Sequence, residues 1–260
     1  MGRRIAFAAA AVPTGLVLVL GAEILHAVNG PTLPARDPLE LSGEIGLDSN
    51  GEILDMVWIG DSVTAGVGAS SVETALPRVV AGALDRPVRL HVFATAGERV
   101  AGALAEQVPR LEGLGISPDV VIVEIGANDV TRLTGPGVFR EEYARLLDRV
   151  SGVGAEHVIA LGIPAFETTP RFLQPLRALV GWRARRLDRE VRGAAEAAGA
   201  TYVDIAGITA DPFDDDPDRY YAADEYHPSD AGYALWAAAV LRALEDAGIA
   251  RGGGATAGGP

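Results

Sequence analysis

ILDMVWIGDSVTAGVG, residues 53–68, is the stretch around which the rest of the chain is organised. It opens as an apolar run of strand length and changes at Gly60 into a small, polar, Gly-rich turn. A buried strand that ends in Gly60, Asp61 and Ser62 places a hydroxyl at the carboxyl edge of a sheet, where open α/β sheets bind ligands. The stretch lacks the letters of a P-loop, of a dinucleotide fingerprint and of an α/β-hydrolase elbow. Ser62 is therefore a candidate nucleophile, with an ordinary polar turn as the alternative.

Apolar runs rich in Val and Ile recur along the chain and alternate with segments of helical period. The expected strands are 53–59, 88–93, 120–125, 157–163 and 201–205, and the expected helices are 97–114, 139–150 and 172–198. Alternating strands and helices indicate right-handed crossovers and a mainly parallel sheet covered on both faces. We predict an α/β fold, with one three-layer α/β/α domain and a five-stranded sheet over residues 52–248.

The two ends of the chain differ from this pattern. Arg3 and Arg4 precede an uncharged apolar run, 5–22, which is close to the minimum length for crossing a bilayer. We predict that residues 1–30 form a membrane anchor with the catalytic domain outside the cytoplasm, the alternative being a cleaved signal segment and secretion. Residues 31–51 open with three prolines by position 38 and are predicted to be a linker. The Gly-rich residues 249–260 are predicted to be a disordered tail.

Composition excludes several classes of function. The formal net charge of −13 argues against a nucleic-acid partner, because binding phosphates requires a basic surface. The chain has no cysteine, which rules out disulfides, thiolate metal sites and a cysteine nucleophile. It has four histidines, so a histidine base must be one of His26, His91, His157 and His227.

The segment from Asp224 to His227 offers a base for Ser62. A serine hydroxyl is a poor nucleophile until a base takes its proton, and that base needs an orienting partner. Asp224 and His227 are three residues apart, directly before an apolar helix that Ser229 or Asp230 caps. In a turn, this spacing brings the carboxylate to one ring nitrogen and leaves the other free for Ser62. A helix-start histidine beside a solvated acidic loop is the alternative.

Two other strand ends offer donors for an oxyanion. Gly97 follows the second strand, and Asn128 with Asp129 follows the third. An ordinary turn and a helix N-cap are the alternatives for these positions. Because all these features follow apolar strands or precede the last helix, we expect them to meet at one end of one sheet.

Together these motifs resemble the blocks of the SGNH (GDSL-type) hydrolase family. Gly60-Asp61-Ser62 with Gly66, then Gly97, then Gly126-Ala127-Asn128-Asp129, and finally Asp224-x-x-His227 occur in the order of that family. The resemblance implies a flavodoxin-like sandwich with Ser62 as nucleophile, His227 as base and Asp224 as its partner. It also implies an oxyanion hole from the Ser62 N–H, the Gly97 N–H and the Asn128 side chain, with Asp61 and Asp129 holding the loops.

The resemblance further implies hydrolysis of a carboxylic ester through an acyl-serine intermediate, with no metal and no organic cofactor. An acyltransferase that passes the acyl group to a sugar or lipid hydroxyl is the alternative, and a tethered binding module without activity is a third. The expected partners are a small-molecule, lipid or acylated-glycan ester and, through residues 1–30, a membrane. The loops 130–138 and 164–182 are expected to choose the substrate. The second loop contains apolar side chains that could contact an acyl chain; the alternative, which we favour, is that they belong to the core under the following helix. They are Ala165, Phe166, Phe172, Leu173, Leu176 and Trp182.

Overall fold

The computed structural model describes residues 2–49 and 51–249, with side chains from residue 15 onward. Its six strands are β1 (Gly43–Ile45), β2 (Leu54–Gly60), β3 (Val88–Ala94), β4 (Val120–Glu124), β5 (His157–Leu161) and β6 (Thr201–Val203). They form one sheet in the order β1-β3-β2-β4-β5-β6. All neighbours pair in parallel except β1, which pairs antiparallel with β3. The predicted α/β class is confirmed, and the expected five strands become six.

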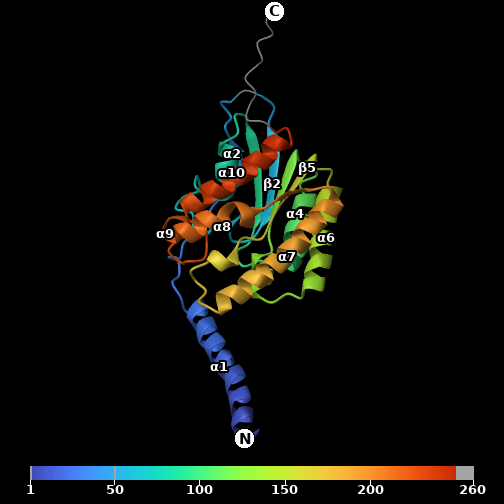
Figure 1. The fold of residues 1–260 in the computed structure, drawn as a ribbon. Coiled ribbons are helices and arrows are strands. Elements are labelled where there is room, and N and C mark those ends of the chain that lie inside the picture. The colour runs from blue at the N-terminus through green and yellow to red at the C-terminus, as the bar shows by residue number, and fades with distance from the viewer. Residues whose placement is uncertain (1, 50, 250–260) are drawn as a thin grey trace, which may run out of the picture.

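Helices cover both faces of this sheet (Figure 1). The helices of the described residues are α1 (Gly2–Val28), α2 (Leu76–Gly82), α3 (Val100–Gly102), α4 (Val108–Glu112), α5 (Ala127–Thr131), α6 (Pro136–Gly152), α7 (Leu176–Ala198), α8 (Ile205–Asp215), α9 (Pro217–Tyr220) and α10 (Asp230–Asp246), of which α1 does not cover the sheet. A π-helical turn, η1 (Ala103–Gln107), and a 3-10 turn, η2 (Phe166–Thr168), complete the elements. The segment expected to be a single helix, 97–114, is therefore divided into α3, η1 and α4.

Successive side chains of β2 fill the two cores. Met56 and Trp58 point to the core under α2 and α10, and Val57 and Ile59 point to the core under α6 and α7. All four side chains are fully buried. This is the period of two that a strand imposes, and a strand buried on both faces has apolar residues at both sets of positions.

β2 lies at the point where the direction of the sheet reverses. β3 follows β2 in the chain and pairs on one side of it, whereas β4 crosses over and pairs on the other side. The loops after these three strands diverge at their carboxyl ends and leave a crevice between them. Ser62, Gly97 and Asn128 each follow one of these strands, so the topology gathers them at a single edge.

The segment predicted to be a linker, 31–51, contributes to the domain. It contains β1, which extends the sheet beyond β3, and Leu41, whose side chain is only 3% exposed. Arg36 donates to the carbonyl oxygens of Gly66 and Ala69, at 2.8 and 2.6 Å. Its weak sequence period concealed this packing, because a three-residue edge strand leaves too few positions for alternation to be read.

Figure 1 shows α1 leaving the domain as a long helix. Within the part of the chain that the structure describes, no helix combines the length and the apolar character needed to cross a membrane. At the other end, the predicted disordered tail lies outside the described residues except for Ile249, whose side chain is buried in the core beside α10.

Candidate active site

The turn after β2 holds Ser62 tightly. A Cβ added to Gly60 would lie 2.0 Å from Thr64 Oγ1 and 2.5 Å from the Glu124 carbonyl oxygen, so only glycine fits there. The turn is then closed by two backbone hydrogen bonds, from Ala65 N to Asp61 O at 2.9 Å and from Val67 N to Ser62 O at 2.9 Å. Ser62 is thereby fixed at the carboxyl end of the sheet.

His227 and Asp224 stand next to Ser62 in the arrangement that activates a serine. The His227 Nε2 atom lies 2.9 Å from Ser62 Oγ, and its Nδ1 atom lies 2.6 Å from Asp224 Oδ2. The other oxygen of Asp224 accepts the backbone N–H groups of His227 and Tyr226, at 3.0 and 3.2 Å. The two oxygens of one carboxylate therefore fix both the backbone and the ring of His227, which gives a physical reason for the spacing of three residues.

Charge reinforces this geometry. Burial by itself would raise the pKa of Asp224, but the hydrogen bonds from His227 and the proximity of its ring outweigh burial and hold that pKa below its usual value. Asp224 therefore stays ionised, as a group that stabilises an imidazolium must.

The two loops of the site also touch each other. Gly68 has φ +98°, and a Cβ there would lie 2.3 Å from the Pro228 carbonyl oxygen and 3.2 Å from His227 Cβ. The Tyr233 hydroxyl of α10 donates to the carbonyl oxygen of Val67. The Ser62 turn and the start of α10 are thus packed backbone against backbone.

Asn128 lies on the first turn of α5, where it lines the same pocket as Ser62 and His227. Its Nδ2 atom donates to Asp61 Oδ2 at 3.0 Å. An amide nitrogen carries two hydrogens, so this bond orients the group and leaves the second hydrogen for a ligand. Gly97 follows β3 at the same edge with φ +80°, beside the Arg132 guanidinium, but it does not line this pocket.

Asp61 and Asp129 hold the loops that carry these groups. Asp61 Oδ1 accepts Val63 N at 3.1 Å, and burial raises the pKa of Asp61 to about 6. Asp129 accepts Val100 N at 3.1 Å and Thr134 Oγ1 at 2.6 Å, and burial raises its pKa also. Asp61 thus connects the Ser62 turn to Asn128, and Asp129 connects the start of α3 to the loop after α5.

The sequence motifs that define this geometry also match a known family. The family model described as "GDSL-like Lipase/Acylhydrolase family" matches residues 58–235. The chain belongs to this family. The matched region begins in β2 and ends in α10, so it contains every site residue described above.

Individual GDSL-like proteins are also similar to this chain. The GDSL-like esterase Rv1075c of Mycobacterium tuberculosis is 35% identical over 197 residues, which cover 74% of this chain and 62% of that protein's length. An α/β hydrolase, LAE5, from the metagenome of Lake Arreo in Spain has a TM-score of 0.59 at 24% identity, covering 74% of this chain and 95% of that one. A lipolytic G-D-S-L protein from Veillonella parvula has a TM-score of 0.62 at 15% identity, covering 74% and 98%. The two solved structures share the fold of this GDSL-like chain.

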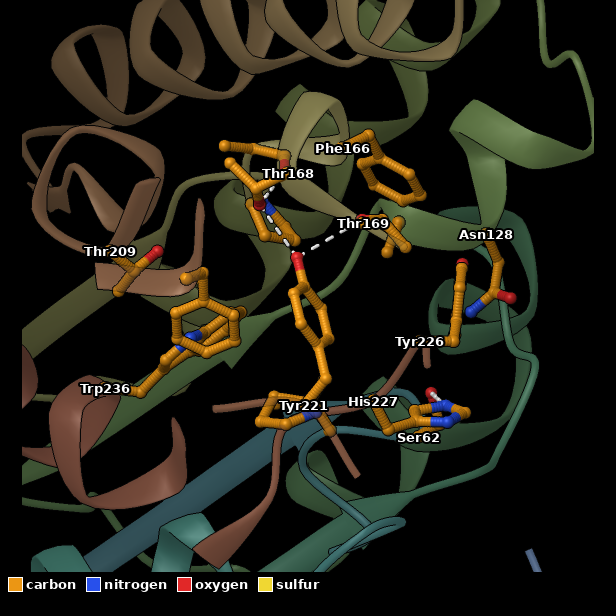
Figure 2. A pocket seen from close by; sticks show the side chains of 16 residues that line it. Ser62, Asn128, Phe166, Thr168, Thr169, Thr209, Tyr221, Tyr226, His227 and Trp236 are labelled. Atoms are coloured by element: carbon orange, nitrogen blue, oxygen red, sulfur yellow. Dashed lines mark hydrogen bonds between the residues drawn. The ribbon is translucent and has the colours of Figure 1, made fainter. Parts of the chain in front are cut away.

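A largely apolar pocket extends from the catalytic end of the site (Figure 2). Ser62, His227 and Asn128 stand at one end, and Thr209 and Trp236 stand at the other, with the Tyr221 hydroxyl between them. The Tyr221 oxygen lies 2.8 Å from Thr168 Oγ1 and 3.4 Å from Thr169 Oγ1. In the described part of the chain, no group of three or more His, Asp or Glu side chains is placed to hold a metal ion.

The apolar residues expected in the loop 164–182 divide into three groups. Ala165 and Phe166 line the pocket, whereas Phe172 is buried against Phe166 and Tyr226. Leu176 is half-buried at the start of α7. Leu173 and Trp182 are exposed at the surface. The core assignment therefore holds for Phe172 and for Ala165 and Phe166, which are buried and also line the pocket, and it is wrong for Leu173 and Trp182.

Two buried polar residues and one arginine support the site without having been predicted. Glu124 accepts Thr64 N and Thr64 Oγ1 at 3.1 and 2.8 Å, and Gln107 pairs with both the N–H and the C=O of Gly60, at 3.0 and 2.9 Å. Arg171 donates to the carbonyl oxygen of Asp224 at 3.0 Å. Glu124 could have been found from the sequence, because it ends the otherwise apolar strand 120–125 and a buried charge is rarely without a partner. Gln107 and Arg171 have no comparable signal in the sequence.

Proposed function

We propose that this GDSL-like chain is a serine hydrolase that cleaves carboxylic esters through an acyl-serine intermediate. The observation that carries the proposal is the 2.9 Å contact between Ser62 Oγ and His227 Nε2, with Asp224 2.6 Å from the other ring nitrogen. The esterase name of the Mycobacterium tuberculosis relative supports the same reaction class.

The first half of the reaction forms the acyl-enzyme. Ser62 Oγ attacks the ester carbonyl while His227 Nε2 accepts the hydroxyl proton, and Asp224 stabilises the resulting imidazolium. The free N–H of Asn128, with the backbone N–H groups of Ser62 and Gly97, is proposed to receive the negative charge that develops on the carbonyl oxygen. Collapse of the tetrahedral intermediate breaks the bond to the alcohol oxygen, and His227 returns the proton to the departing alkoxide.

The second half repeats these steps with water. His227 takes a proton from water, the hydroxide attacks the acyl carbonyl, and Ser62 leaves with the proton that His227 returns. The products are a carboxylic acid and the enzyme with a free Ser62 hydroxyl, so atoms and charges balance over the cycle. We propose that the apolar pocket beyond the catalytic end accommodates the acyl chain.

The test of this function compares wild type with Ser62→Ala on 4-nitrophenyl acetate and with a fluorophosphonate probe. We expect the substitution to abolish both turnover and covalent labelling, because it removes the hydroxyl that lies 2.9 Å from His227 Nε2. As the control, Ser70→Ala removes a serine from the same loop region whose hydroxyl bonds Asp230 rather than His227, and it should retain both. If Ser62→Ala still turns over the ester, Ser62 is not the nucleophile.

We further propose that residues 1–30 hold the catalytic domain at the outer side of the cell membrane. The support is the sequence pattern of Arg3 and Arg4 before an apolar run, together with exposed apolar side chains on α1 such as Leu18 and Leu25. Protease treatment of intact cells, followed by membrane fractionation, tests this location. A catalytic domain protected from protease would contradict it, and a soluble extracellular protein lacking residues 1–30 would indicate cleavage and secretion.

A further inference from the structure

Several large apolar side chains are exposed on the catalytic side of the domain. We call five of them the apolar rim: Leu133, Val138, Leu173, Leu179 and Trp182. They come from the α5–α6 loop, the first turn of α6, the segment before α7 and the first turns of α7. Leu133 is 73% exposed and Trp182 is 54% exposed. Exposed apolar groups that gather in one region indicate a surface for another partner.

The elements that carry the apolar rim are joined to one another. Arg183 of α7 donates to the carbonyl oxygens of Val130, Asp129 and Thr134, which fixes the Leu133 loop against α7. Helices α6 and α7 lie side by side (Figure 1). Leu179 and Trp182 are three residues apart and therefore share one face of α7. The rim side chains thus lie on elements that are held against one another.

Leu133 is held in a backbone conformation that a leucine seldom adopts. Its φ is +59°, in the left-handed region that favours glycine and asparagine. Neither the backbone strain nor the exposure of the side chain to water stabilises the isolated protein. Strain of this kind, of the order of 1 kcal/mol or more, is typical of positions used for binding or catalysis. We therefore read the outward-pointing Leu133 side chain as a contact group.

The same region is basic, although the chain as a whole is acidic. Residues 131–140 and 170–187 contain seven arginines and no Asp or Glu, on a chain of net charge −13. Arg132, Arg140 and Arg186 are exposed, and the Arg186 guanidinium lies over the Trp182 ring, 5.8 Å from its centroid. Acidic residues flank both segments: Asp129, Glu141 and Glu142 lie next to the first, and Glu167 and Asp188 lie next to the second. Of these, Glu167 is paired with Arg185, and Asp188 accepts the Tyr202 hydroxyl.

This basic, apolar region adjoins the catalytic residues and the end of α1. Leu173 follows Phe172, which packs against Tyr226 next to His227. The carboxylate of Glu23 on α1 accepts the first N–H of α7, from Leu176, at 2.8 Å. Figure 1 shows α1 leaving the domain beside the start of α7. A partner that touched both α1 and the apolar rim would therefore lie next to the site that holds Ser62.

We propose that the apolar rim and its arginines dock this domain on an anionic lipid bilayer, so that Ser62 receives esters carried by the bilayer. The inference rests on the proposed ester hydrolysis and adds the physical state of the substrate. Apolar side chains inserted among headgroups, together with arginines near anionic lipids, are the two forces that hold proteins at a membrane surface. A symmetric dimer through the rim would place the arginines of two copies against each other, and this like-charge contact is unfavourable. An anionic lipid surface complements the same arginines, so we favour the bilayer as the partner.

The first test uses the full chain and a variant of the apolar rim, Leu133→Asn/Leu179→Ser/Trp182→Ser. The matched control, Leu47→Ser/Ile53→Ser/Ile116→Ser, removes three exposed apolar side chains outside the rim. Rates are measured on a long-chain fluorogenic ester embedded in vesicles of phosphatidylcholine with about 30% phosphatidylglycerol, and on soluble 4-nitrophenyl acetate. We expect the rim variant to lose about tenfold or more on the vesicle-borne ester and nothing on the soluble one. The control should match wild type on both.

Each outcome of this test decides between the two proposals. Equal rates for wild type and the rim variant on vesicles would overturn the docking face, and so would a rim-dependent dimer in solution that binds no vesicles. If wild type does not hydrolyse the soluble ester, the proposed function itself is wrong. In that case flotation of the proteins with the same vesicles still tests docking, because it requires no turnover.

A second variant tests the charge. Arg140→Gln/Arg186→Gln should weaken flotation with the phosphatidylglycerol vesicles about fivefold for each arginine at low ionic strength, since one basic residue near an anionic surface contributes about 1 kcal/mol. Binding to vesicles of phosphatidylcholine alone should not change. An equal loss on both kinds of vesicle would show that these arginines do not recognise lipid charge.

Discussion

At the scale of single residues, two buried carboxyl groups lie directly under the nucleophile. Glu124 accepts the N–H and hydroxyl of Thr64, and Asp61 accepts Val63 N and Asn128 Nδ2, so these side chains hold the turn that presents Ser62 in addition to its backbone hydrogen bonds. Burial, with the nearby charge of Asp61 as a second cause, places the pKa of Glu124 well above its usual value. The folded protein therefore keeps the Glu124 proton at pH values where the unfolded chain has lost it.

This proton makes stability depend on pH in a definite direction. Stability from a raised carboxyl pKa is fully present below the unfolded value, about 4.3, and is lost as pH rises toward the folded value. We predict that Glu124→Gln, which cannot ionise, loses less free energy of unfolding than wild type between about pH 5 and about pH 7. Guanidinium denaturation at several pH values measures this. The exposed Glu141→Gln is the control and should follow wild type; parallel curves for all three proteins would contradict the prediction.

At the scale of elements, Arg171 connects the end of α1 to the loop of the catalytic acid. Its guanidinium donates to the carbonyl oxygens of Ala27, Pro31 and Asp224, and its backbone N–H donates to Glu225 O at 3.2 Å. One side chain thus joins three segments that are distant in the sequence. Hydrogen bonds from a charged donor are stronger than neutral ones, so this contact fixes the Asp224 loop relative to α1 and α7.

Removing this connection should affect catalysis more than substrate binding. We predict that Arg171→Leu lowers kcat about tenfold on a soluble ester with little change in KM, because Asp224 orients His227 rather than contacting the substrate. Arg177→Leu is the matched control, since the Arg177 guanidinium donates to the carbonyls of Phe172 and Pro170 in its own segment. Steady-state kinetics of both variants provide the measurement. A change confined to KM, or equal effects of the two substitutions, would show that Arg171 does not position the acid.

At the scale of the whole molecule, the segment between α1 and β2 is part of the folded domain. Leu41 is buried in the core under α2 and α10, and its side chain, with that of Leu39, lies against Gly66 in the loop after Ser62. Arg36 bonds the carbonyls of that same loop, and β1 pairs with β3. The chain therefore passes along the catalytic edge and contacts the Ser62 loop before it enters the central strand.

Truncation of a buried side chain in this segment tests whether it stabilises the domain. We predict that Leu41→Ala lowers the free energy of unfolding by about 2–4 kcal/mol, the usual loss when a buried leucine leaves a cavity. Leu47→Ala, at a 59% exposed position in the same segment, should change it by less than about 0.5 kcal/mol. Guanidinium denaturation measures both. Equal stabilities would mean that the segment only rests on the surface.

The sequence by itself determined the parallel strands, the fold class and the residues around Ser62. Long apolar runs bounded by glycines can be read locally, and parallel pairing then brings their carboxyl ends to one edge. Only the tertiary structure decided that 31–51 packs on the domain, that Gln107 and Glu124 support the Ser62 turn, and that Arg171 joins α1 to Asp224. These contacts connect residues far apart in the chain through single polar side chains, and a single polar side chain has no period that reveals its partner.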